Sequence, residues 1–194
     1  ADHVMVPHSR YLFDKGDVDD SLASTYACSG LTAYSALKKV GELTSGDEVI
    51  LIGAGGVGSM ALQIALAQGF SPIVVDVDES KLALAKELGA KAVYNASDRA
   101  SVKAIKQQSE GGAFAVIDFV GSEASTGFGL GCLRKGGKLI IVGLYGGALN
   151  MPLPFIPMSA RIIQGTYVGS LAEMGELMEL VRAGKIAPIR SEEH

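Results

Sequence analysis

A glycine-rich segment, Gly53-Ala-Gly-Gly-Val-Gly58, has the spacing G-x-G-x-x-G and directly follows the apolar run 48–52. An unbroken apolar run is typical of a strand buried on both faces. After such a strand, the first glycine permits a tight turn, the second lets a pyrophosphate approach the backbone, and the third allows close helix–strand packing. The free N–H groups of the following helix then attract phosphate. The pattern predicts a dinucleotide site at Gly53, Gly55, Gly56, Val57 and Gly58.

A structural glycine turn without a ligand is the alternative, and Asp76 argues against it. Asp76 ends the next predicted strand, about 20 residues beyond the loop, where an acid commonly binds the adenosine ribose. Its carboxylate would repel a 2′-phosphate by about 4 kcal/mol at about 4 Å near a protein surface. Because Val77 follows rather than an arginine, we predict NAD rather than NADP. Lys81 is a second candidate for the ribose; otherwise Asp76 caps a turn beside Asp78, and Lys81 is solvated.

From residue 48 onward, short β-branched runs alternate with helical patterns. The runs 48–52, 73–75, 92–94, 115–119, 138–142 and 162–168 predict about six strands. The helical patterns lie between them, and Ser170 with Glu173 forms a capping box for a last helix. This alternation predicts βαβ units, and right-handed crossovers then favour an α/β fold with a doubly wound parallel sheet, the Rossmann fold.

Residues 1–47 lie outside this alternation, so we expect two regions. The first, residues 1–47, is an N-terminal arm and a junction helix over 26–39, with a short strand at 4–6 and a connector over 12–20. The second, residues 48–194, is the dinucleotide-binding domain.

Composition and charge limit the classes of partner and the location. The chain has 194 residues with 17 Lys and Arg against 21 Asp and Glu, which gives a net charge of −4. A mildly acidic chain lacks the basic surface that nucleic acids and anionic membranes require. The stretch 49–75 has no charge, but glycines and Pro72 interrupt it, so we expect no membrane span. The two cysteines, Cys28 and Cys132, are far apart in sequence, and we expect a cytoplasmic protein.

Four segments together resemble one known family. They are Cys28-Ser-Gly-Leu-Thr-Ala-Tyr34, the glycine loop, Val75-Asp-Val-Asp78 and Leu84-Ala-Lys-Glu-Leu-Gly-Ala90. In order and spacing they are similar to the zinc-dependent alcohol dehydrogenases of the medium-chain dehydrogenase/reductase superfamily, over nearly the whole chain. The resemblance implies an NAD-dependent oxidoreductase that transfers hydride between an alcohol and nicotinamide, with a catalytic zinc ion as Lewis acid.

Members of that family are much longer than this chain. The resemblance implies that the chain is a fragment, comprising the cofactor-binding domain and the helix leading into it, without most zinc ligands, the proton-relay residues and the structural zinc lobe. It assigns no general acid or base here, so no catalytic residue is predicted. We expect the isolated fragment to bind NAD weakly, to lack metal and to be inactive.

The resemblance also implies particular site residues. Cys28 would be one ligand of the catalytic zinc in the full-length enzyme, and Thr32, one helical turn later, would face the nicotinamide. The alternative for Cys28 is a small buried apolar side chain. The family places the cofactor along the ends of the fourth to sixth strands, which implicates Phe119, Val120, Gly121, Val142, Gly143 and Leu144, and more loosely Thr166 and Val168.

Two other functions and one kind of assembly remain open from the sequence. A zinc-free quinone or enoyl reductase would share the sheet and the loop, as would a non-redox domain that binds a nucleotide or S-adenosylmethionine, for which Asp118 is a suitable acid. For the dehydrogenase, the expected substrate is a small alcohol, aldehyde or ketone. Because family members pair through the sheet edge, we also expect a homo-oligomer through the strand at 162–168.

Overall fold

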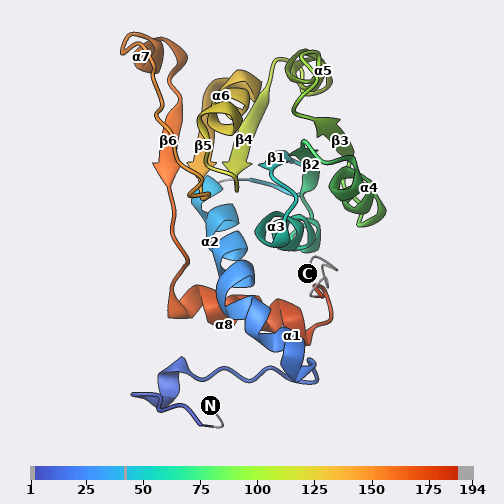
Figure 1. Cartoon of the computed structure of the whole chain (residues 1–194), viewed down its shortest axis with the longest axis vertical. Helices are drawn as coiled ribbons and strands as arrows, with labels where there is room; N and C mark the ends of the chain where they lie inside the picture. Colours follow the sequence, from blue (N-terminus) through green and yellow to red (C-terminus); the bar gives the residue numbers. More distant parts are fainter. Residues whose placement is uncertain (1–2, 42, 188–194) are drawn as a thin grey trace.

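The computed structural model describes residues 3–41 and 43–187 and contains one six-stranded parallel sheet (Figure 1). The strand order is β3-β2-β1-β4-β5-β6, which is the predicted doubly wound arrangement. The strands are β1 (Glu48–Ile52), β2 (Ser71–Asp76), β3 (Ala92–Asn95), β4 (Ala113–Asp118), β5 (Leu133–Ile141) and β6 (Ile162–Gly165). The last residues of the expected dinucleotide-binding domain, 188–194, lie outside the described residues.

Helices cover both faces of the sheet because neighbouring strand residues point to opposite sides. Val49 and Leu51 pack on the side of α2, α3 and α4, whereas Ile50 and Ile52 pack on the side of α5 and α6. The helices are α1 (Asp20–Thr25), α2 (Leu31–Val40), α3 (Gly56–Ala67), α4 (Glu79–Glu87), α5 (Ser101–Gln108), α6 (Glu123–Cys132), α7 (Phe155–Ser159) and α8 (Leu171–Arg182). No helix among the described residues is long and apolar enough to cross a membrane.

Some local expectations were wrong. Residues 4–6 form no strand, and Met5 is 94% exposed, because none of the strands in the described part of the chain pairs with them. The strand expected at 138–142 begins earlier, since Leu133 pairs with Ala113 before the register shifts within β5. The helix expected over 26–39 is interrupted at its start by a π-helical turn, η2 (Tyr26–Gly30).

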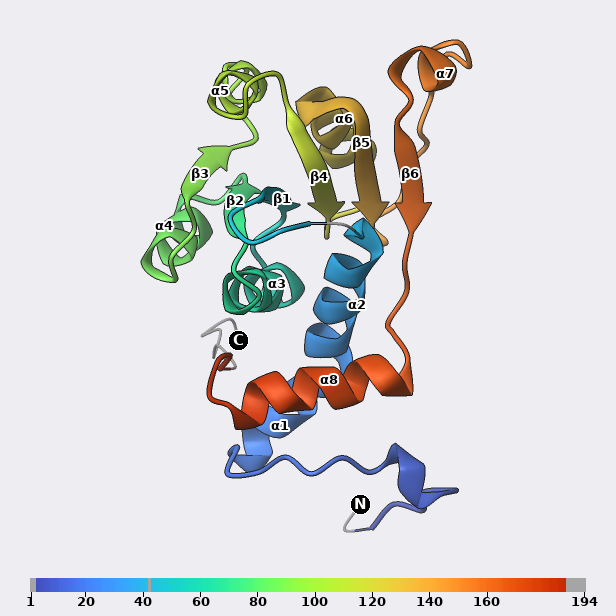
Figure 2. The ribbon, with the colours of Figure 1, turned by 180° about the vertical axis from the view of Figure 1, so that it is seen from behind.

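The helix α8 does not pack on the sheet. It crosses α1 and α2 on the side to which the arrowheads of β4, β5 and β6 point (Figures 1 and 2). Leu177 and Met178 of α8 are buried in the same cluster as Tyr26 and Leu31. This contact fixes η2 and the start of α2 relative to α8.

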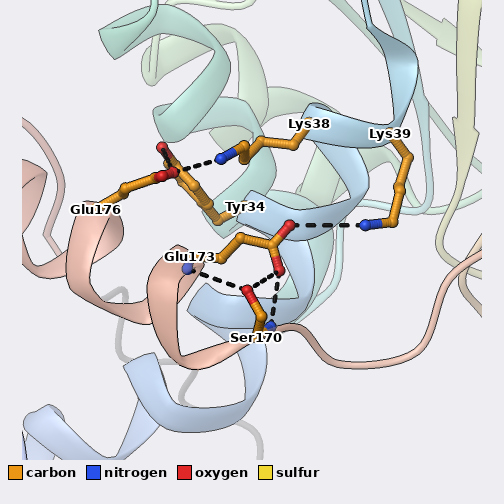
Figure 3. A network of polar contacts seen from close by, with 6 residues as sticks. All are labelled: Tyr34, Lys38, Lys39, Ser170, Glu173 and Glu176. Carbon is orange, nitrogen blue, oxygen red and sulfur yellow. Dashed lines mark hydrogen bonds and ion pairs between the residues drawn. The ribbon is translucent and has the colours of Figure 1, made fainter.

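Polar contacts add to this apolar packing (Figure 3). Ser170 and Glu173 form the predicted capping box at the start of α8, and Glu173 also lies 3.7 Å from the Lys39 ammonium. One turn later, Glu176 accepts hydrogen bonds from Tyr34 (2.8 Å) and Lys38 (2.7 Å). Two carboxylates of α8 therefore bind side chains of α2, among them Tyr34, Lys38 and Lys39.

The pKa of Glu173 reflects this setting. Burial alone would raise the pKa of Glu173. The hydrogen bonds with the backbone and hydroxyl of Ser170, together with the charge of Lys39, have the larger effect, so the pKa lies below its usual range. A carboxyl group with a lowered folded-state pKa stabilises the fold above its unfolded pKa and loses that contribution as pH falls through the folded pKa.

Glu173→Gln should therefore lower the free energy of unfolding at pH 7 by about 1–3 kcal/mol, the cost of weakening hydrogen bonds to a buried charge. The difference from wild type should shrink as pH falls below the ordinary carboxyl pKa. Urea unfolding at a series of pH values measures this. Glu179→Gln is the matched control, because it removes an equal charge from an exposed position on α8. An equal loss in both variants would contradict the assignment.

Candidate functional site

The glycine loop joins β1 to α3, and its tight turn packs the start of α3 directly against the end of β1. Gly53 has a φ of +92°, and its N–H donates to the Val75 carbonyl oxygen at 2.7 Å. A Cβ on Gly58 would lie 1.7 Å from the Gly53 carbonyl oxygen, so only glycine fits there. Gly55, by contrast, has nothing within 4 Å of a would-be Cβ, and it caps α3 without a side-chain hydrogen bond. The first N–H groups of α3 are therefore available to a phosphate.

Asp76 lies directly against this loop. Its Oδ2 accepts from the Ala54 N–H at 2.6 Å, and its Oδ1 accepts from the N–H groups of Val77 (2.7 Å) and Asp78 (3.0 Å). A carboxylate has about four acceptor positions, so one on Oδ2 remains for a ligand hydroxyl. Asp76 thus shapes the turn and also presents an acceptor to the crevice. Asp78 caps α4, accepting hydrogen bonds from the N–H groups of Ser80 and Lys81.

A cavity of about 310 Å³ opens beside Asp76. Its walls come from the ends of β1 to β4 and from the first two turns of α6. The lining residues are Ile52, Gly53, Val75, Asp76, Val77, Ala96, Ser97, Val120, Ser122, Ala124, Ser125 and Phe128. Val77 is 65% exposed, so the cavity presents an apolar side chain next to the Asp76 carboxylate, as a nucleoside requires. Lys81 is half-buried on α4 and does not line this cavity.

The loops after β4 and β5 touch each other. A Cβ on Gly121 would lie 1.9 Å from the Gly143 carbonyl oxygen, and one on Gly143 would lie 2.1 Å from the Val120 carbonyl carbon. Phe119 and Val120 in turn lie against the glycine loop, since a Cβ on Gly53 would be 2.9 Å from Val120 Cγ2. The structure therefore brings the predicted residues of the β1, β4 and β5 ends together.

The remaining strand-end predictions lie further out. Val142 is half-buried, and Leu144 is 79% exposed at the end of β5. Thr166 donates its N–H to the Ile141 carbonyl oxygen, and Val168 has an unusual φ of +54°.

Asp118 is a buried acid whose role the sequence reasoning missed. It has no exposed surface, and its carboxylate accepts hydrogen bonds from Val120, Gly121, Ser125 and Thr126. Such an acid cannot contact a substrate, which removes the role that a methyltransferase would give it. The hydroxyls at Ser125 and Thr126, one turn into the next helix, are the only sequence signal of its environment.

Cys28 lies in the π-helical turn η2 and is exposed, contrary to the alternative of a buried apolar side chain. The next residue, Ser29, has its Oγ 4.0 Å from a would-be Cβ on Gly56, so η2 borders the glycine loop. Thr32 follows, half-buried, in the first turn of α2. Because a π turn contains more residues than an α turn, Cys28 and Thr32 are not related by one ordinary helical turn.

Zinc ligation requires three or four donors around one point. Among residues 3–41 and 43–187, no group of three His, Cys, Asp or Glu side chains is placed to hold a metal ion. Cys28 therefore does not form a zinc site with other residues in the described part of the chain.

Comparisons with known proteins agree with this geometry. A family model for zinc-binding dehydrogenases matches residues 56–183. An NAD-dependent alcohol dehydrogenase of Sulfurisphaera tokodaii is 38% identical over 192 residues, which are 97% of this chain and 55% of that protein. One from Sulfolobus acidocaldarius is 42% identical over 193 residues, again 97% and 55% of the two chains.

Solved structures show the same relationship. The alcohol dehydrogenase of Aeropyrum pernix has a TM-score of 0.80 at 36% identity, covering 87% of this chain and 50% of that chain. The D-arabinose dehydrogenase of Sulfolobus solfataricus has a TM-score of 0.85 at 25% identity, covering 95% of this chain and 58% of that chain. The chain thus spans about half the length of the curated relatives it matches. This chain belongs to the zinc-binding dehydrogenase family.

Proposed function

We propose that this chain binds NAD and forms the cofactor-binding part of an NAD-dependent alcohol dehydrogenase. The observation that carries the proposal is the 2.6 Å hydrogen bond from the Ala54 N–H to Asp76, by which a carboxylate lies directly beside the glycine loop. In the proposal this carboxylate accepts from the ribose, and the backbone N–H groups of the loop bind the phosphates. Two relatives are named NAD-dependent alcohol dehydrogenases, which supports the same activity for the whole protein. The substrate would be a small alcohol or its aldehyde or ketone.

Bound NAD would supply the hydride acceptor or donor. The glycine loop (Gly53, Gly55, Gly56, Val57 and Gly58) would bind the pyrophosphate through backbone N–H groups, and Asp76 would accept a ribose hydroxyl. The ends of β4 and β5 would hold the remainder, with Phe119, Val120, Val142, Gly143 and Leu144 excluding water. Thr32 would lie on the nicotinamide side, and Lys81 near the ribose. These residues bind and orient, and none transfers a proton.

Cys28 is proposed as one zinc ligand, since it is exposed and its segment borders the glycine loop. The other ligands would have to come from outside the described residues, so no step of the reaction is derived through zinc. The same proposal includes a cytoplasmic location, which the two separated cysteines favour.

We also propose that two copies pair through β6. This strand is at the edge of the sheet, where no strand among the described residues pairs with the backbone N–H and C=O groups on its outer side. Ile162 is 49% exposed and Ile163 37% exposed, so the edge is also apolar. Exposed apolar edges of this kind favour strand pairing with another chain.

Replacing Asp76 tests the ribose assignment. Asp76→Ser should reduce the preference for NADH over NADPH by at least about fivefold, because a fixed charge that repels the 2′-phosphate is removed. Fluorescence titration with both nucleotides measures the ratio of their dissociation constants. A general loss of order in the loop would weaken binding of both nucleotides alike and would leave this ratio unchanged. Asp78→Ser is the control: it removes an equal charge two residues away while keeping a good helix cap. A selectivity unchanged by Asp76→Ser would refute the assignment.

Replacing Gly55 tests the pyrophosphate assignment. Gly55→Ala should leave the thermal unfolding midpoint nearly unchanged, because a Cβ there meets nothing within 4 Å and φ is −70°. It should still weaken NADH binding about tenfold or more, because the methyl group occupies the phosphate position. Gly127→Ala, equally unhindered but on α6, is the matched control and should bind NADH normally. Normal binding by Gly55→Ala would rule out this loop as the phosphate site.

Charging the sheet edge tests the assembly. Ile163→Lys should shift the chain from dimer to monomer in analytical ultracentrifugation, because pairing through β6 would bury the charge of the new lysine. Leu84→Lys is the control, since Leu84 is also 37% exposed but lies on α4, away from the edge. A monomeric wild-type chain at micromolar concentration, or a dimer that persists in Ile163→Lys, would contradict the proposal.

A further inference from the structure

The carboxylate of Asp118 is fully buried at the end of β4, although it takes no part in the binding contacts proposed above. Its Oδ1 accepts from the backbone N–H groups of Val120 (2.9 Å) and Gly121 (3.0 Å). Its Oδ2 accepts from the hydroxyls of Ser125 (2.8 Å) and Thr126 (2.9 Å). Two donors belong to the loop after β4 and two to α6, so one side chain joins the loop to the helix.

The backbone of Asp118 joins the same loop to the next strand. Its carbonyl oxygen accepts from the N–H groups of Val142 (2.9 Å) and Gly143 (3.1 Å) at the end of β5. Beyond it, the Gly121 carbonyl oxygen accepts from Gly146 at 3.1 Å. Together with the contact between Gly121 and Gly143, these bonds leave the two loops no room to move independently.

This pair of loops separates two hollows in the surface. Val120 lines the cavity beside Asp76, Gly121 and Gly143 line a second hollow of about 310 Å³, and Ser122 lines both. A shift of residues 119–121 would change both hollows and also the glycine loop, which Val120 contacts.

We propose that Asp118 is a positioning residue for the dinucleotide crevice: it holds the loop 119–121 as the fixed wall between the ribose-binding cavity and the end of β5. The inference rests on the proposed function, because the loop 119–121 has a ligand to position only if the chain binds a dinucleotide. A carboxylate suits the task, since it accepts from all four converging donors without donating itself. Charge-assisted hydrogen bonds of this kind are also shorter and stronger than neutral ones.

Asp118→Asn is the informative variant. The amide has the size of the carboxylate, and both hydroxyls can rotate to accept from its NH₂ group, so the chain should fold. The neutral oxygen should hold the Val120 and Gly121 N–H groups less firmly. Ile105→Ala is the matched control, because Ile105 is fully buried in α5 and lines neither hollow.

Two measurements on the whole chain separate positioning from stability. Titration with NADH should show a dissociation constant about tenfold higher in Asp118→Asn, as expected for weakened hydrogen bonds to a charge. AMP should lose less affinity, since it would contact Val120 but not the end of β5. Amide hydrogen exchange without nucleotide should accelerate at residues 120–121 and 142–143 specifically. Ile105→Ala should lower the unfolding midpoint but change neither the NADH dissociation constant nor amide exchange at these residues.

The results decide between the alternatives. If both variants alter NADH affinity and amide exchange alike at equal loss of stability, Asp118 is an ordinary core residue and the inference is wrong. If exchange accelerates locally but the wild-type chain binds no NADH, the proposed function fails, and the dinucleotide role of Asp118 is overturned with it. If wild type binds NADH and Asp118→Asn binds it equally well, the proposed function stands and the positioning role does not.

Discussion

The close approach of Gly58 to the Gly53 carbonyl oxygen is the contact on which the site depends. No side chain fits between them, so α3 starts directly at the end of β1. The N-terminal N–H groups of α3, which have no partner within the helix, therefore face the carboxyl edge of the sheet. At the same edge, Asp76 accepts from Ala54, the loop residue directly after Gly53. The tight turn thus brings the N–H groups proposed to bind phosphate close to the carboxylate proposed to bind ribose, although they come from different strands.

A second constraint holds the segment that carries Cys28. On one side, Ser29 borders the start of α3; on the other, a Cβ on Gly30 would lie 3.0 Å from Leu177 of α8. Because the polar contacts of Glu173 and Glu176 fix α8 on α2, the π-helical turn is held between two helices. This packing gives the exposed cysteine a defined place near the glycine loop, which a free arm would not.

Much of this arrangement could be predicted from local sequence patterns with a single physical cause. The glycine loop, the six strands and the capping box of α8 are of this kind. The early start of β5 could not be predicted, because the pairing of Leu133 with Ala113 depends on a register shift that no local pattern encodes. The environment of Asp118 was equally hidden, since its four donors converge only after β4, its loop and α6 have packed.

Asp76 combines two requirements that a change of cofactor preference would have to separate. Three backbone N–H groups hold its carboxylate in place without any ligand, so binding a ribose would cost little side-chain entropy. The same bonds keep the negative charge from moving away from a 2′-phosphate, which strengthens discrimination. Removing the carboxylate also leaves the N–H groups of Ala54, Val77 and Asp78 without the acceptor that they have in Asp76. Acceptance of NADP therefore requires both a new partner for the phosphate and a replacement for the bonds that shape the turn.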